Sequence, residues 1–456
     1  MEGKRFAGIE VPPDLQRRNF FFLYLNLLLI GILLAIPAMM QPAFLKDIIK
    51  VSGDFFGSIN GAMQSIGQVA MLLFIGVLGV LSDRIGRKPL AVIGFAVLAI
   101  SFLLFLYSNT IASFLSIPSD AAATFCAALS FTSDQDVFRS FSPGLLMAYL
   151  IRFVIGFGLV MVFPQFKAMI ADYTDEKGRG KGMAFNGLMI GLGALLVFTV
   201  FSPLGRRSGI EMLFYASALI GVVGVGMSFL GLRERLPERK EHNAGVKELI
   251  HVVRESLAMK ASYLCALVTR VDVPITATYL ITWAVKVGPS YGMSSETASF
   301  KGAVPMMVMS TFTLVAFPVF GILLDRWGRV PTIILTLFLG GMGFLIIAGA
   351  PSPFLSSATL IGVTLVGCSV CGAVVGSSAL AADASPPELM GSTLGGLNTM
   401  AQVGLIFFLA IGGVLFDKVG PGGVFLVKGI ANIVVGVYIF AVRKKIRINP
   451  EGSPSV

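Results

Sequence analysis

Charged side chains are scarce in this 456-residue chain: only 13% of the residues are Asp, Glu, Lys or Arg, whereas 55% are hydrophobic. This balance argues against a water-soluble fold. Histidine is also rare, with two copies, and the four cysteines are scattered, so no disulfide framework is indicated. The sequence contains no Gly-x-x-x-x-Gly-Lys-Ser/Thr phosphate loop and no Ser/His/Asp or Cys/His set. We therefore expect neither an ATP-driven pump nor an enzyme, and no bound cofactor.

Long apolar runs take the place of the missing charges. A helix needs about 20 residues to cross roughly 30 Å of hydrocarbon. Twelve runs of that kind are present, at residues 20–41, 57–82, 88–108, 143–171, 182–203, 211–232, 260–285, 299–324, 330–350, 355–382, 391–416 and 422–442. The first run lacks a small-residue cleavage site, so we expect a retained helix rather than a signal peptide. The chain is predicted to be an all-α membrane protein with 12 transmembrane helices.

The net charge of +10 has a topological explanation. Most basic residues lie in the N-terminal tail, in the loops that follow even-numbered spans, and at the C-terminus. Positive residues accumulate on the cytoplasmic side of a membrane protein. Both termini are therefore predicted to be cytoplasmic, with the protein in the plasma (inner) membrane, and no nucleic-acid partner is expected.

A short charged segment occurs twice, once in each half of the chain. The stretch Gly79-Val-Leu-Ser-Asp-Arg-Ile-Gly-Arg-Lys88 returns 242 positions later as Gly321-Ile-Leu-Leu-Asp-Arg-Trp-Gly-Arg-Val330. A second match relates Asp172, followed by Arg179-Gly180, to Asp383, followed by Met390-Gly391, at a distance of 211 positions. The difference of 31 residues indicates an insertion in the first half. Such a duplication predicts two pseudo-symmetric six-helix bundles.

The repeat also predicts the domain boundaries. Residues 1–232 form the N-terminal bundle, with the polar segment 109–142 as an extracytoplasmic insertion, and residues 260–456 form the C-terminal bundle. Between them, residues 233–259 make a polar linker. Apolar residues from Val246 to Leu257 share one helical face there, which predicts a short amphipathic helix at the cytoplasmic surface. The two histidines of the linker are interpreted as solvated residues rather than proton relays.

Twelve spans in two halves, with this motif after spans two and eight, closely resemble the major facilitator superfamily of secondary transporters. The first copy matches the family pattern Gly-x-x-x-Asp-Arg-x-Gly-Arg-Lys throughout, whereas the second departs at Val330, and the Asp–seven–Arg-Gly signature departs at Met390. The resemblance implies two bundles that rock about a central site, and a motif that locks the cytoplasmic gate in the outward-facing state. The implied gate residues are Gly79, Asp83, Arg84, Gly86, Arg87, Lys88, Gly321, Asp325, Arg326, Gly328, Arg329, Asp172, Arg179 and Asp383.

Elementary chemistry suggests how the first motif works. Asp83 ends a helix, where the macrodipole disfavours a carboxylate, so a compensating partner is expected: Arg84, Arg87 or a helix N-terminus from the other half. Gly79 is expected to allow close contact between span two and a neighbour, and Gly86 to turn the short loop. Alternatively, these charges only orient the protein in the bilayer.

Three charged residues are predicted to lie near the middle of the membrane, where each costs at least roughly 2.5–3.5 kcal/mol. Asp272 is the proton-coupling candidate, because it is the sole carboxylate predicted well inside a span. Arg152 is expected to pair with Asp272 or to bind an anionic substrate. Arg270 lies about 200° round the helix from Asp272 and cannot face the same way. The alternative is a buried ion pair with only a structural role. Pro274 follows within a turn and is expected to free a backbone carbonyl there, as broken helices at binding sites do.

Polar residues repeat every four positions on two spans. Asn60 and Gln64 on span two, and Asn398 and Gln402 on span eleven, either contact substrate or hydrogen-bond between helices. With Arg152 and Arg270, they are the substrate-binding candidates. Cys368 and Cys371 have the spacing of a metal pair, but no His or acid accompanies them, so they are interpreted as packing residues and no metal is expected.

The functional hypothesis is a secondary active transporter that takes up an anionic or zwitterionic organic solute with protons. Its expected partners are a small-molecule solute, a coupling ion and the lipid bilayer, and the protein is expected to be monomeric. A proton-coupled multidrug exporter is the main alternative, although span five lacks the Gly-Pro element of such antiporters. A lipid flippase, or a sensor that binds without transport, are further alternatives.

Overall fold

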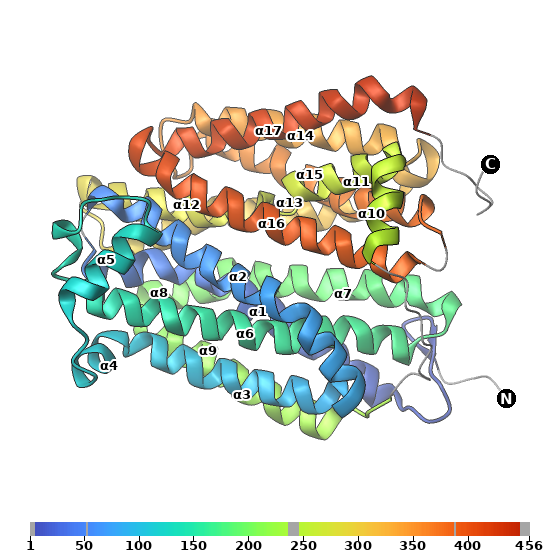
Figure 1. The fold of residues 1–456 in the computed structure, drawn as a ribbon, viewed down its shortest axis with the longest axis horizontal. Coiled ribbons are helices and arrows are strands. Elements are labelled where there is room, and N and C mark those ends of the chain that lie inside the picture. The colour runs from blue at the N-terminus through green and yellow to red at the C-terminus, as the bar shows by residue number, and fades with distance from the viewer. Residues whose placement is uncertain (1–4, 52, 236–245, 387–388, 447–456) are drawn as a thin grey trace. The chain divides into compact units, whose positions relative to one another are not determined.

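The computed structural model describes residues 5–51, 53–235, 246–386 and 389–446. The described chain is almost wholly helical (Figure 1). Twelve of its helices are long and apolar enough to cross a membrane, and each overlaps one of the twelve predicted spans. The prediction of an all-α membrane protein with two six-helix halves is therefore confirmed.

The chain divides into two compact units. Unit 1 comprises Met1–Arg239 and Val285–Ala303, and unit 2 comprises Lys240–Ala284 and Val304–Val456. Unit 1 thus includes a segment, Val285–Ala303, that the sequence repeat assigns to the C-terminal half. Lys46 accounts for part of this association, because its Nζ donates to the Val285 carbonyl at 2.8 Å. Ser295 likewise donates to Asp47 at 2.8 Å.

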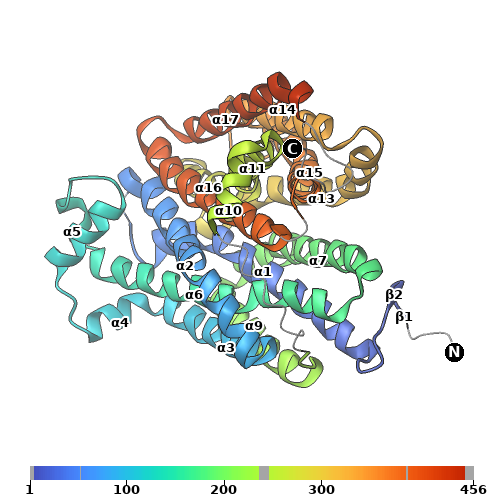
Figure 2. The ribbon, with the colours of Figure 1, turned by 45° about the vertical axis from the view of Figure 1, so that its right-hand side comes forward.

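Six spans build unit 1. They are α1 (Arg17–Asp47), α2 (Phe56–Ile85), α3 (Arg87–Leu106), α6 (Ser142–Tyr173), α7 (Glu176–Leu196), which continues through the π-helical η3 (Val197–Phe201) into α8 (Ser202–Ser208), and α9 (Glu211–Gly231). The short elements are β1 (Arg5–Phe6), β2 (Ile9–Glu10), η1 (Gly53–Phe55), α4 (Ser108–Phe114), α5 (Ser119–Leu129), η2 (Asp136–Phe138) and η4 (Gly288–Tyr291). Helix α3 packs between α6 and α9, and α1 packs against α7 and α9 (Figure 2).

Unit 2 repeats this arrangement. Its helices are α10 (Val246–Glu255), α11 (Leu257–Thr269), α12 (Asp272–Val287), α13 (Ser295–Arg326), α14 (Arg329–Ala348), α15 (Ser357–Asp383), α16 (Met390–Lys418), α17 (Pro421–Val442) and η6 (Arg443–Lys445). Helix α14 packs between α15 and α17, as its repeat mate α3 packs between α6 and α9. The pseudo-symmetry predicted from the sequence therefore extends to the packing within each unit.

Four glycines mark equivalent turns in the two units. Gly86 and Gly328 precede α3 and α14 with φ of 102° and 93°, and Gly209 and Gly420 precede the last span of each unit with φ of 84° and 105°. Their ψ values, from 152° to 171°, place all four in a region that only glycine occupies readily. The pairs lie 242 and 211 positions apart, which are the two distances of the sequence repeat.

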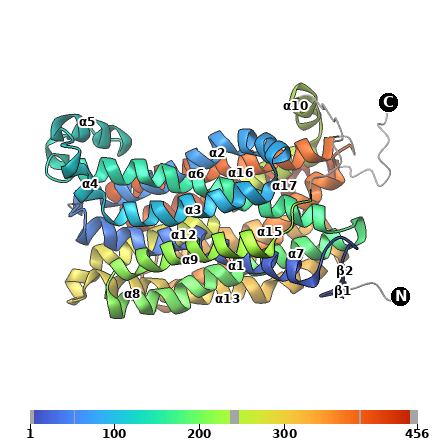
Figure 3. The ribbon, with the colours of Figure 1, turned by 90° about the horizontal axis from the view of Figure 1, so that it is seen from below.

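The short elements of unit 1 lie at its two ends. Helices α4 and α5 are at one end, and the hairpin of β1 and β2 is at the other (Figure 3). In the hairpin, Arg5 pairs with Glu10 and Phe6 with Ile9 in antiparallel register. The predicted insertion 109–142 thus contains two helices, and α5 packs on α6.

Span seven is interrupted at Arg270 and Val271, between α11 and α12. Pro274 lies in the first turn of α12, where its missing N–H is tolerated, and it cannot donate to the Arg270 carbonyl one turn earlier. The close contact expected at Gly79 is not found within unit 1, where a Cβ built on Gly79 would meet no described residue within 4 Å.

The predicted linker helix is present as α10. Val252 and Val253 pack against a cluster of buried residues from α11, α15 and α16 that includes Met259, Tyr263 and Leu397. Part of the apolar face of α10 is therefore covered by unit 2 itself. His251 is exposed, in agreement with a solvated residue, and His242 lies outside the described residues.

We predict that Gly86→Ala destabilises the protein by about 1–3 kcal/mol, because φ of 102° strains any residue with a Cβ. That Cβ would also lie 2.8 Å from Glu234 Oε2. The matched control is Gly79→Ala, in the same motif but in an open, helical position, which should leave stability unchanged or raise it by up to about 1 kcal/mol. Thermal unfolding in detergent measures both, and equal melting temperatures would refute the backbone argument.

Candidate functional site

A buried ion pair lies in the interior of unit 2. Lys428 Nζ is 2.6 Å from Asp272 Oδ1, and the two side chains are 0% and 1% exposed. Lys428 also donates to Asn432 Oδ1 at 2.5 Å, while Asn432 Nδ2 is 3.5 Å from Asp272 Oδ2. The rings of Phe344 and Phe408 lie 4.9 and 5.5 Å from the ammonium. The charges of α12 and α17 thus compensate each other in a site closed by aromatic rings.

The interruption of span seven explains the placement of its two charges. Asp272 lies in the first turn of α12, where the positive end of the helix dipole favours a carboxylate. Arg270 is the C-cap of α11, where the negative end favours a cation. Its Nη2 donates to Ser378 Oγ at 2.8 Å and to the Val374 carbonyl at 3.4 Å, both on α15. The two neighbouring charges therefore point to different helices, as their spacing predicts.

Arg152 is buried in unit 1, with 3% of its surface exposed. Its Nη2 donates to Gln64 Oε1 at 3.1 Å. Nε and Nη1 have no hydrogen-bond partner among the described residues, nor does Gln64 Nε2. The absence of a side chain at Gly67 makes room for this guanidinium, since a Cβ there would lie 2.5 Å from Arg152 Nη1. Asp272, which was one of the two alternative partners expected for Arg152, forms its ion pair with Lys428 inside unit 2.

The two predicted polar stripes differ in their surroundings. On α2, Asn60 is fully buried and Gln64 nearly so. On α16, Asn398 is exposed and Gln402 is half-buried, with no hydrogen-bond partner for its Oε1 among the described residues. The stripe on α2 is brought together with a predicted charge, because Gln64 accepts a hydrogen bond from Arg152.

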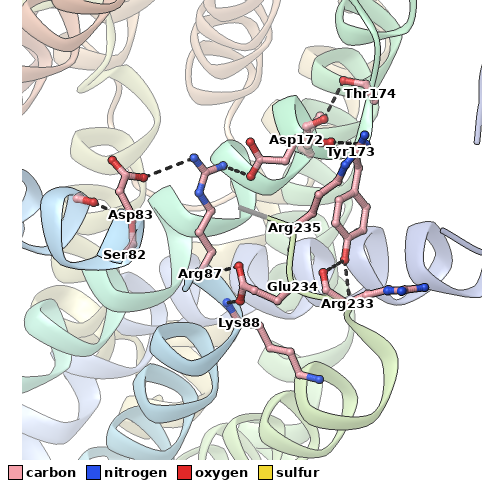
Figure 4. Close-up of polar contacts among 12 residues, drawn as sticks. Ser82, Asp83, Arg87, Lys88, Asp172, Tyr173, Thr174, Arg233, Glu234 and Arg235 are labelled. Carbon is pink, nitrogen blue, oxygen red and sulfur yellow. Dashed lines mark hydrogen bonds and ion pairs between the residues drawn. The ribbon is translucent and has the colours of Figure 1, made fainter. Parts of the chain in front are cut away.

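The first charged motif forms a triad at one end of unit 1 (Figure 4). The buried Arg87 side chain makes an ion pair with Asp172 at the end of α6 and a second one, at 3.5 Å, with Asp83 at the end of α2. Asp172 is as buried as Arg87, whereas the Asp83 side chain is 62% exposed. Arg87 is thus the expected partner that compensates Asp83. The other candidate, Arg84, is exposed.

Residues just after α9 hold this triad in place (Figure 4). The Glu234 carboxylate accepts hydrogen bonds from the backbone N–H groups of Arg87 at 3.0 Å and Lys88 at 2.8 Å. It therefore caps the N-terminus of α3, where two backbone donors would otherwise lack partners. Arg235 donates to the Asp172 carbonyl at 2.7 Å. The start of the linker is in this way connected to the first charged motif.

Unit 2 contains the equivalent triad. Arg329 lies 3.1 Å from Asp383 and 3.4 Å from Asp325, at the positions related by the repeat to Arg87, Asp172 and Asp83. These side chains are more exposed than those of unit 1. The residue that corresponds to Glu234 is Lys445, 211 positions later, which has the opposite charge. Arg179 and Arg326, the other predicted gate arginines, are exposed.

Sequence reasoning missed three residues of these clusters. Lys428 lies within the predicted span 422–442, and Asn432 follows one helical turn later. A lysine inside an apolar run, four residues before an asparagine, is the sequence signal that indicates this buried polar site. No comparable signal marks Glu234 in the sequence, because it lies in a run of charged residues. Only the tertiary structure shows which of these residues caps α3.

The cysteines behave as packing residues. Cys371 is buried against Ala316 and Phe320, and Cys368 lies at the edge of the same cluster. Among the described residues, no three His, Cys, Asp or Glu side chains are grouped so that they could hold a metal ion.

Comparison with known proteins places the chain in a family context. The sequence profile of the Major Facilitator Superfamily matches residues 20–352 and 263–455. Magnetosome protein MamH of Paramagnetospirillum magneticum is 25% identical over 432 residues, which cover 95% of this chain and 94% of MamH. Magnetosome protein MamZ of Magnetospirillum gryphiswaldense is 23% identical over 442 residues, which cover 96% of this chain but only 64% of MamZ.

Solved structures show the same fold. The nucleoside transporter NupG superposes with a TM-score of 0.68 at 14% identity, covering 94% of this chain and 98% of NupG. A D-xylose-proton symporter superposes with a TM-score of 0.66 at 16% identity, covering 96% of this chain and 99% of the symporter.

The ion pair of unit 2 yields a stability prediction. Lys428→Met or Asp272→Asn alone removes one partner of the pair, and breaking a buried pair in this way costs about 3–5 kcal/mol. The double variant removes both charges, so it should be more stable than Asp272→Asn alone, which leaves the ammonium uncompensated. Thermal unfolding in detergent measures this double-mutant cycle. Additive losses would mean that the two side chains do not interact.

Proposed function

This chain belongs to the major facilitator superfamily, and we propose that it is a secondary active transporter that takes up an anionic or zwitterionic organic solute together with protons. The family consists of transporters and not enzymes, and the protein is an integral, multi-pass membrane protein. We further propose that it works as a monomer, by alternating access of its two six-helix bundles.

The proposal of an anionic or zwitterionic solute rests on the buried guanidinium of Arg152. A charge within a membrane-spanning helix is costly and needs compensation. Arg152 has one hydrogen bond, to a neutral amide, and two nitrogens without a partner among the described residues. A carboxylate or phosphate offers two oxygens in the geometry of the guanidinium fork. An anionic group of the solute would therefore satisfy Arg152, and Gln64 Nε2 would supply a further donor.

The Asp272–Lys428 pair supports proton coupling. Both side chains are buried, so their charges depend on each other, and protonation of the carboxylate would leave the ammonium uncompensated. The pair adjoins the interruption between α11 and α12, where the chain has no continuous helical hydrogen bonding. We propose that a proton on Asp272 releases Lys428 and allows α12 to move relative to α17. Arg270, held by Ser378, is assigned a positioning role in this step.

The two triads support a gate at the end of each unit where they lie. We propose that this end is cytoplasmic, as the distribution of basic residues predicts. The N-terminal segment, the ends of α2 and α6, and the residues after α9 all meet at this end of unit 1, since Arg235 contacts both Asp14, at 3.6 Å, and Asp172. The more buried triad, of Arg87, is the stronger candidate for the lock of the outward-facing state.

The solute can be sought by thermal stability measurements on the detergent-purified protein, with panels of organic anions, amino acids, sugars, cationic drugs and lipids. A ligand at 100 times its Kd stabilises by about 2.7 kcal/mol. We expect stabilisation by an anion, loss of the effect in Arg152→Gln, and partial retention in Arg152→Lys, which keeps the charge but not the fork. Stabilisation by cationic drugs or lipids alone, unchanged in Arg152→Gln, would reject the anion proposal in favour of export or lipid movement.

Proton coupling is tested in proteoliposomes with the solute so identified. Asp272→Asn combined with Lys428→Met keeps the site uncharged, and we expect loss of uptake driven by a proton gradient while exchange of labelled for unlabelled solute continues. Arg139→Gln serves as the control, since it removes a charge from the exposed Asp120–Arg139 ion pair, which lies outside the spans, and should retain gradient-driven uptake. Undiminished uphill transport in the double variant would remove Asp272 from the coupling mechanism. Binding without any flux in the unaltered protein would indicate a sensor.

A further inference from the structure

The insertion at the end of unit 1 exposes large apolar side chains that neither unit covers. Phe114 is 87% exposed, Leu115 56%, Phe125 50% and Phe131 60%. They lie in three separate places: the end of α4, the middle of α5 and the loop after α5. Exposed apolar groups gathered in one insertion mark an interaction surface.

Hydrogen bonds fix α4 at the level where the spans end. Asn109 Nδ2 donates to the carbonyl of Ile48, the C-cap of α1, at 2.7 Å. A Cβ on Gly144, near the start of α6, would collide with the Asn109 side chain. Next to α4, the hydroxyl groups of Tyr107 and Tyr215 form a hydrogen bond of 2.7 Å. Both rings are exposed, and such tyrosines are typical of the boundary between hydrocarbon and water.

The exposed residues continue the lipid-facing surface of α3. Ile93, Ile100 and Leu104 are exposed along that span, and Tyr107 follows at its C-terminal end. Phe114 and Leu115 lie at the end of α4, the short helix that follows α3 directly in the chain. The apolar surface of the insertion is therefore continuous with a surface that the bilayer already covers.

Helix α5 has the three faces of a helix at a lipid–water boundary. Ala122 and Cys126 are buried on the face that packs on α6. On one flank, Asp120 forms an ion pair with Arg139 at 3.1 Å. Phe125 lies on the other flank, because successive residues turn by about 100°. The buried face of α5 thus lies between a polar flank, which suits water, and an apolar flank, which suits lipid. This arrangement is typical of a helix at a lipid–water boundary.

The backbone conformation just after α5 also supports burial of this surface outside the protein. Phe131 has φ of 55°, a left-handed conformation that is strained for a bulky residue. Burial within the protein does not compensate this strain, since the side chain is 60% exposed. Burial of the ring in an apolar phase outside the protein would do so, at about 25 cal/mol for each Å² removed from water.

We propose that the insertion 109–142 is an interfacial anchor whose apolar side chains, Phe114, Leu115, Phe125 and Phe131, enter the lipid at the membrane boundary of unit 1. Attraction to anionic lipid contributes nothing, because the insertion carries three aspartates and one arginine. The occupant of this surface is therefore the acyl region of the bilayer, of any head-group charge. The anchor holds the connection between α3 and α6 against the membrane, and it does not depend on the identity of the solute.

Spin labels at single cysteines test this inference in the full chain, reconstituted in nanodiscs of neutral phosphatidylcholine. Labels are placed in Phe114→Cys and Phe131→Cys, with the exposed polar Ser133→Cys as the matched control. The background carries Cys368→Ser, because Cys368 is half-buried. Cys126 is buried, which raises the pKa of its thiol to about 12 and keeps it unreactive near neutral pH.

Relaxation by oxygen, which partitions into lipid, is compared with relaxation by a water-soluble nickel complex. We expect oxygen to dominate at positions 114 and 131 and the nickel complex to dominate at position 133. Changing the lipid from neutral to anionic should leave this order unchanged. Dominance of the nickel complex at both 114 and 131 would overturn the proposal and assign the surface to an aqueous protein partner instead. Two positions are labelled so that one poorly folded variant does not decide the result.

Discussion

The cost of placing charge away from water is the constraint on which this structure depends. Within membrane-spanning helices a charged group must be paired, hydrogen-bonded or bound to a ligand. Asp272 and Lys428 satisfy this requirement in unit 2, with Asn432 as a third member. Arg87 and Asp172 do so in unit 1. Arg152 is less fully compensated, since its one hydrogen bond among the described residues is to an amide oxygen and two of its nitrogens have no partner there. The paired charges stabilise the unit in which they lie, whereas Arg152 retains nitrogen atoms that are available to a ligand.

The duplicated framework is symmetric, but its charges are not. Glycines in the same unusual conformation begin the equivalent helices, and a triad of one arginine and two aspartates occurs at the equivalent end of each unit. The buried charges, by contrast, occur on one side of the repeat only: Asp272 corresponds to Ile30 and Lys428 to Ser217. The fold common to both units therefore does not require these charges.

Glu234 shows how one substitution within a repeat creates a new connection. Its carboxylate caps α3, whereas the equivalent Lys445 could not accept hydrogen bonds from backbone N–H groups. The triad next to Glu234 is the more buried of the two. Unit 1 therefore has a charged triad that is connected to the segment leading into the linker, and unit 2 has a more exposed triad without that connection.

The sequence by itself determined the fold class, the twelve spans, the duplication and the repeated charged motif, because hydrophobic length and repeated motifs are properties of local chain segments. It also placed Asp272, Arg152 and Arg270 inside spans by counting residues. Only the tertiary structure decided the partners: Lys428 rather than Arg152 for Asp272, and Glu234 rather than another charge of the linker for α3. Pairing depends on which helix faces lie opposite each other, and residues 156 positions apart, such as Asp272 and Lys428, carry no local signal of that contact. The same reason explains why Gly79 fits the motif yet has no close contact with the described residues of unit 1.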